Sequence, residues 1–65
     1  YSNPQDPISH FNLANLYRVM GENEMAIEEY SHVIALKQQG ANVGNLYLDS
    51  LVNIGICYKN KGAID

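Results

Sequence analysis

The sequence has little of what usually holds a small protein together. It has 65 residues and a single cysteine, and a chain this short buries little apolar surface without a disulfide, a metal or a neighbouring element. Because Cys57 is the only cysteine, no disulfide can form within the chain. His10 and His32 are far apart in the sequence and near no cysteine, so no metal site is predicted. A lone thiol is typical of a reducing compartment, which predicts an intracellular location, cytoplasmic or nuclear.

Basic residues and long apolar runs are also scarce. Four lysines and arginines stand against seven aspartates and glutamates, which gives a net charge of −3. Nucleic acids are bound by basic surfaces, so this balance argues against a nucleic-acid partner. No apolar run approaches the ~20 residues of a membrane-spanning helix, which argues against a membrane partner. The chain has no signal-peptide pattern and begins with Tyr1 rather than methionine, so we expect it to be a piece of a longer protein.

What the sequence does contain is three segments with apolar residues at helical spacing. Residues 1–6 have the composition of a turn or linker. Asp6 followed by Pro7 is typical of a helix start, because the carboxylate can cap the first turn and proline fits its first position. A first helix is therefore expected at about 7–20, ended by Gly21.

Two further helices are expected downstream. The second spans about 24–39 and ends at Gly40, and the third spans about 45–60, with Gly62 beyond its end. No segment alternates between apolar and polar residues with a period of two, so the expected fold class is all-α. The short connection after Gly21 predicts an antiparallel hairpin of the first two helices. The apolar face expected for the third helix has Cys57 at its edge and consists of Leu46, Leu48, Leu51, Val52, Ile54, Gly55 and Tyr58.

A pattern in the first helix recurs in the third. Five positions match at a constant offset of 41 residues: Asn12 with Asn53, and Leu13, Ala14, Tyr17 and Gly21 with Ile54, Gly55, Tyr58 and Gly62. Such internal similarity is typical of helical repeat proteins. In the physical interpretation, Ala14 or Gly55 faces a small residue of the second helix, Ala26, so that the two backbones approach closely. Tyr17 and Tyr30 then fill the space on either side.

The repeated residues, together with Ala26, Ile27, Tyr30 and Ile34, resemble the tetratricopeptide repeat (TPR), a helix hairpin of ~34 residues. The resemblance implies an α-α superhelix built from stacked hairpins. Residues 7–40 would form one repeat, and residues 45–65 would form the first helix and turn of a second, truncated repeat, with the rest of the array outside the chain.

Three departures separate the chain from the family pattern. His10 stands where tryptophan is frequent, Gln38 stands where proline usually ends the second helix, and the period of 41 residues exceeds the usual one. Without the proline, the second helix is expected to continue to about Gln39, and the loop after it accounts for the rest of the longer period. A repeat of this length is similar to those of kinesin light chains and of bacterial peptide-sensing regulators.

The resemblance also implies a function and a site. In this family, the first helices of successive repeats line a concave groove that binds an extended peptide or a partner protein, so the chain is expected to be an interaction scaffold. The residues in register with the groove are Phe11, Asn12, Asn15, Arg18, Val19, Asp49, Val52, Asn53, Ile56, Lys59 and Asn60. Asn12 and Asn53 are similar to the asparagine ladder of the O-linked N-acetylglucosamine transferase superhelix, whose amides can track a peptide backbone. The alternative is that both are ordinary polar residues on exposed helix faces.

Other roles are either disfavoured or left open. The carboxylate clamp of chaperone-binding family members is matched at Asn15 and Asn53, but Phe11 replaces its lysine, so that partner is not expected. The parent protein is alternatively a larger enzyme, such as a glycosyltransferase with this array as its substrate-recruiting arm, or a peptide-sensing regulator. Within the 65 residues, no catalytic residue and no cofactor is expected. Cys57 is interpreted as a small buried residue, since no base is placed near it. His10 and His32 are interpreted as packing or surface residues rather than ligands.

Overall fold

The structure is a computed structural model that describes residues 6–62, so residues 1–5 of the predicted linker and residues 63–65 of the predicted second repeat lie outside the described residues. It contains α1 (Pro7–Val19), α2 (Asn23–Gln38) and α3 (Leu46–Gly62). Within residues 6–62 every regular element is helical, which confirms the predicted all-α class.

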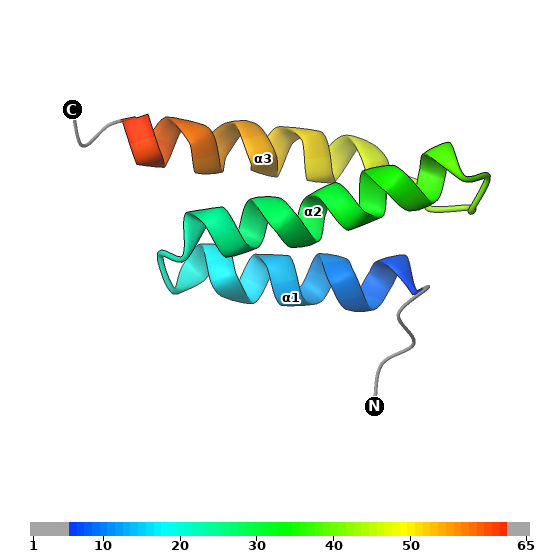
Figure 1. Ribbon diagram of the computed structural model, residues 1–65, viewed down its shortest axis with the longest axis horizontal. Coiled ribbons are helices and arrows are strands. Elements are labelled where there is room, and N and C mark those ends of the chain that lie inside the picture. Colours follow the sequence, from blue (N-terminus) through cyan, green and yellow to red (C-terminus); the bar gives the residue numbers. More distant parts are fainter. Residues whose placement is uncertain (1–5, 63–65) are drawn as a thin grey trace.

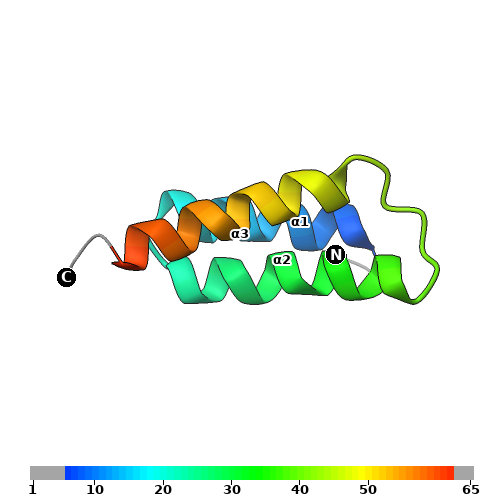
Figure 2. The same ribbon diagram turned by 90° about the horizontal axis from the view of Figure 1, so that it is seen from above.

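Helix α2 packs along both other helices. In Figure 1 it lies between α1 and α3, and α1 and α3 run in the same direction, antiparallel to α2. In the turned view of Figure 2, α1 and α3 lie on the same side of α2, so the three helices form a shallow V rather than a flat layer. Helices α1 and α3 also contact each other, over a shorter length than either contacts α2. The predicted groove would therefore lie on the surface that α1 and α3 share.

The ends of α1 and α2 follow signals that the sequence contains. Asp6 Oδ1 accepts a hydrogen bond from the backbone N–H of Ile8 at 3.0 Å, which caps the first turn of α1. Gly21 and Gly40, which follow α1 and α2, have φ angles of +83° and +96°. An L side chain is strained in this left-handed conformation, so glycine ends both helices at low cost. The expected antiparallel hairpin is present.

Helix α3 ends later than the sequence predicted. Gly62 was expected beyond the helix but is its last residue, and it does not have the positive φ angle of a left-handed stop. The loop before α3 is held by its own apolar residue: Val43 is 6% exposed and packs with Val33 and Leu36 of α2. This contact fixes where α3 begins relative to the hairpin.

A second buried cluster joins all three helices. Ala14 of α1, Ala26 and Tyr30 of α2, and Cys57 of α3 have no exposed surface. Ala14 and Ala26 thus face inward, as the repeat pattern predicted. Phe11 packs against this cluster and against the cluster around Val43, and its ring meets the Tyr30 ring edge-on, with the centroids 5.7 Å apart. Edge-on aromatic pairs of this kind add to the stabilisation from buried area.

The buried face of α3 is not the predicted one. Ser50 and Cys57 are fully buried, and Leu46 and Ile54 pack against the two clusters. The exposed residues from the predicted face are Leu48, Leu51, Val52, Gly55 and Tyr58. The prediction was therefore wrong for these five. Cys57 lies within the buried face rather than at its edge, and its interpretation as a small buried residue is confirmed. The reason is that α1 and α2 both contact the stripe through Ser50 and Cys57, while no described segment covers the neighbouring stripe.

The second copy of the repeat pattern is consequently less packed than the first. A Cβ atom added to Gly55 would meet nothing within 4 Å, so this glycine does not face another small residue within the described part of the chain. Tyr58 is 58% exposed, and Leu13 in the first copy is also exposed. None of the helices in residues 6–62 is long and apolar enough to cross a membrane.

Candidate functional site

The predicted groove residues lie on α1 and α3, the two helices that run in parallel on one side of α2 (Figures 1 and 2). Seven of them are exposed: Asn12, Val19, Asp49, Val52, Ile56, Lys59 and Asn60. Four are half-buried: Phe11, Asn15, Arg18 and Asn53. The four half-buried residues contact other parts of the fold, and these contacts determine which of their hydrogen-bonding groups are left for a ligand.

A polar network joins three of these half-buried residues to the core. The Tyr30 hydroxyl donates a hydrogen bond to Asn15 Oδ1 and accepts one from Arg18 Nε at 3.2 Å. Asn53 Nδ2 donates to the same Asn15 oxygen at 3.4 Å. A buried tyrosine hydroxyl normally needs such partners, because an unpaired polar group in a core is costly. The network ties α1, α2 and α3 together beneath the predicted groove.

The network changes the chemistry available at the asparagines. An amide oxygen has two lone pairs, and both hydrogen bonds to Asn15 Oδ1 are internal. Asn53 also uses its amide nitrogen internally. Asn12, by contrast, is exposed. Asn12 and Asn53, which match at the repeat offset of 41 residues, therefore differ in their surroundings, although the repeat pattern predicts that they are equivalent.

The surface beside the Asn15–Asn53 contact is mixed in character. On α3, Val52 and Ile56 are four residues apart and lie on one side of the helix, with 62% and 39% of their surfaces exposed. Lys59 and Asp49 lie toward the two ends of the same stripe and carry opposite charges. This arrangement offers apolar contact in the middle and charge at either end.

Cys57 does not have the surroundings of a catalytic thiol. It is fully buried in the cluster with Ala14 and Tyr30. Burial raises the pKa of the Cys57 thiol, and the positive charge of Arg18 offsets this only in part. The reactive species of a cysteine is the thiolate, so this thiol is held in its unreactive form at neutral pH.

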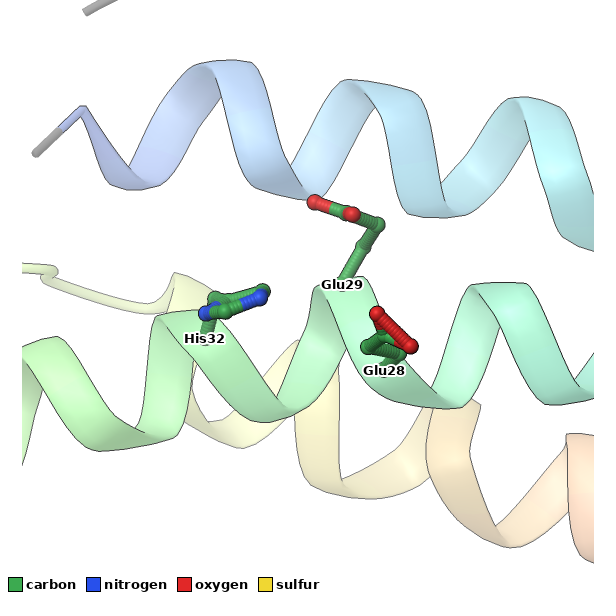
Figure 3. Close-up of side chains that lie close together, drawn as sticks. All are labelled: Glu28, Glu29 and His32. Carbon is green, nitrogen blue, oxygen red and sulfur yellow. The ribbon is translucent and has the colours of Figure 1, made fainter. Parts of the chain in front are cut away.

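The structure brings together a group of side chains that sequence reasoning did not connect. Glu28, Glu29 and His32 of α2 have ligand atoms within 4.8 Å of one another, and Figure 3 shows them along one side of the helix. Across the hairpin, His10 Nδ1 lies 2.8 Å from Glu29 Oε1. The His10 and His32 rings are stacked, with centroids 4.8 Å apart and an interplanar angle of 25°. We call these four residues the histidine–glutamate cluster.

One signal in the sequence points to this cluster. His10 is eleven residues before Gly21, and His32 is eleven residues after it. In an antiparallel hairpin that turns at Gly21, positions at equal distances from the turn lie opposite each other. The predicted hairpin therefore already implies that His10 and His32 pair, although they are 22 residues apart in the sequence.

Comparison with protein-family models, curated proteins and solved structures gave no match to this chain. The class that the fold defines is thus an all-α arrangement of antiparallel helices.

Proposed function

We propose that the chain is a repeat module of the TPR type that binds an extended peptide or partner protein on the surface formed by α1 and α3. The observation that carries the proposal is the parallel arrangement of α1 and α3 on one side of α2 (Figure 2), with exposed apolar side chains beside their contact. The inward positions of Ala14 and Ala26 support the family resemblance.

The surface has the features of a peptide-binding site rather than of an enzyme active site. Val52 and Ile56 provide apolar area, and Asn12 provides an exposed amide that can both donate and accept hydrogen bonds. The network under the surface fixes the spacing of α1 and α3, so a ligand need not order these helices when it binds. Preorganisation of this kind lowers the entropy that binding costs.

The test uses peptides selected on the immobilised chain from a random display library, followed by calorimetry with the strongest binder. The variant Val52→Asp combined with Ile56→Asp introduces charge into the apolar part of the surface, and its affinity is expected to fall more than tenfold. Asn12→Ala removes one exposed amide and is expected to cost about 1 kcal/mol, roughly a fivefold loss.

The matched control is Met25→Asp on α2, because Met25 is also exposed, at 43%, but is not on α1 or α3. Its affinity is expected to equal that of the unmodified chain. If the double variant binds the selected peptide as tightly as the control does, or if selection yields no saturable binder, the proposed site is wrong.

A further inference from the structure

The histidine–glutamate cluster has the composition of a metal site on a different surface from the proposed groove. His10 belongs to α1, and Glu28, Glu29 and His32 belong to α2. Figure 3 shows Glu28 and His32 in front of α2 and Glu29 pointing toward α1, with α3 passing behind α2. The cluster therefore lies on the α1–α2 hairpin, on the side away from α3.

The spacing on α2 places three donors on one face. Glu28 and His32 are four residues apart, and Glu29 and His32 are three apart, which are the separations of neighbours on a helix surface. Donor atoms around a tetrahedral zinc ion, each about 2.1 Å from the metal, are roughly 3.4 Å from one another. The three donors of the cluster are within 4.8 Å of one another, so small side-chain rotations suffice to bring them to that distance.

His10 supplies the second, independent part of the arrangement. A carboxylate can only accept hydrogen bonds, so the nitrogen of His10 that contacts Glu29 must carry the proton and donate it. A hydrogen bond of this kind fixes the orientation of a metal-binding carboxylate. His10 and Glu29 are only 19% and 16% exposed at their side chains, whereas Glu28 and His32 are exposed. One ligand is thus held in place, and the other two are open to an arriving ion.

We propose that Glu28, Glu29 and His32 bind a divalent transition-metal ion such as Zn²⁺, with His10 as a positioning residue. An imidazole with two carboxylates suits zinc and its neighbours in the transition series. Ca²⁺ and Mg²⁺ are disfavoured, because they prefer oxygen ligands alone and in larger number. Three protein ligands leave one coordination position for water or another small donor. Because the hydrogen bond from His10 links the site to α1, the bound ion also stabilises the hairpin.

The experiment is calorimetric titration of the untagged 65-residue chain with zinc chloride near neutral pH. One zinc ion per chain is expected to bind. His32→Ala and Glu28→Gln each remove an exposed ligand, and each is expected to weaken binding at least tenfold. Asp49→Asn is the control: Asp49 is exposed and belongs to α3, outside the cluster, and this variant removes one carboxylate and is expected to bind zinc unchanged.

The role of His10 has its own readout. His10→Phe keeps an aromatic ring against His32 but loses the donor to Glu29, so zinc affinity is expected to fall about tenfold. The metal-free variant also loses the hydrogen bond across the hairpin and is expected to melt at a lower temperature, so both chains are titrated at a temperature at which circular dichroism shows them folded. Cobalt substitution gives the ligand type, and the spectrum is expected to lack a thiolate charge-transfer band. Three results would overturn the proposal: no saturable zinc binding tighter than about 1 mM, unchanged affinity in His32→Ala and Glu28→Gln, or a thiolate band that places the ion on Cys57.

Discussion

The buried hydroxyl of Tyr30 allows the packing of the three helices to be tested with the removal of one atom. Tyr30→Phe keeps the ring and its edge-on contact with Phe11 but removes the hydrogen bonds to Asn15 and Arg18. A hydrogen bond contributes about 0.5–1.5 kcal/mol to stability, so two give about 1–3 kcal/mol. Because Asn15 and Arg18 are half-buried, water can hydrogen-bond to them in the variant, which reduces the loss of stability. We therefore expect a destabilisation of about 1–2 kcal/mol, or roughly 7–15 °C in the melting temperature for a domain of this size.

The assay is urea unfolding followed by far-ultraviolet circular dichroism. Tyr58→Phe makes the same chemical change on α3 at a residue that is 58% exposed, and its midpoint is expected to equal that of the unmodified chain. Combining Tyr30→Phe with Asn15→Ala should cost less than the sum of the two single changes, since both remove the same bond. If Tyr30→Phe and Tyr58→Phe had the same midpoint, the network would contribute nothing to stability and the reasoning would be refuted.

Two further predictions concern α3. Gly55 is in the interior of α3, has no positive φ angle and has free space around it. Gly55→Ala is therefore expected to stabilise the chain by about 0.5–1 kcal/mol in the same urea assay. A loss of stability would show that the position is closely packed. Burial raises the pKa of the Cys57 thiol, so an unfolded chain loses this proton first as the pH rises past about 8.5. The stability that the protonated thiol provides is therefore complete below that pH and is lost as the pH rises above it. The free energy of unfolding of Cys57→Ser is expected to fall less steeply at alkaline pH than that of the unmodified chain. Equal pH dependence in the two chains would contradict the burial of the Cys57 thiol as its cause.

The start of α1 and the ends of α1 and α2 could be predicted from the sequence because local signals determine them. Asp6 caps α1 with its own side chain, and Gly21 and Gly40 adopt conformations that other residues avoid. Such signals act between residues that are close in the sequence. The end of α3 was predicted less well, because Gly62 is compatible with both a helical and a left-handed conformation, and the residues around it do not decide between them.

The buried side of α3 could not be predicted by the same means. The helix has two neighbouring stripes, and the more apolar one, with Leu48, Leu51 and Tyr58, is exposed. The buried stripe includes Ser50 and Cys57, which a ranking by hydropathy places lower than leucine. Which stripe is buried is determined by the docking of α3 on the V formed with α1 and α2, and this is a tertiary property. Helical periodicity predicts that an amphipathic helix is present, but it does not predict which of two adjacent faces is buried.

The polar network also decides how a ligand would be recognised on the proposed surface. An asparagine ladder binds a peptide backbone through the oxygen and the nitrogen of each amide, and Asn53 gives one of its two N–H donors to Asn15 and is half-buried. Only Asn12 of the matched pair is exposed. An amide hydrogen bond contributes about 1 kcal/mol. Burying a valine or isoleucine side chain that starts fully exposed contributes about 1.5–3 kcal/mol, and only the exposed 62% of Val52 and 39% of Ile56 are left for a ligand to cover. If the proposed surface binds a peptide, Val52 and Ile56 together would contribute at least as much affinity as the amide of Asn12. Binding would then depend on the apolar side chains of the partner, whereas an asparagine ladder would bind many sequences alike.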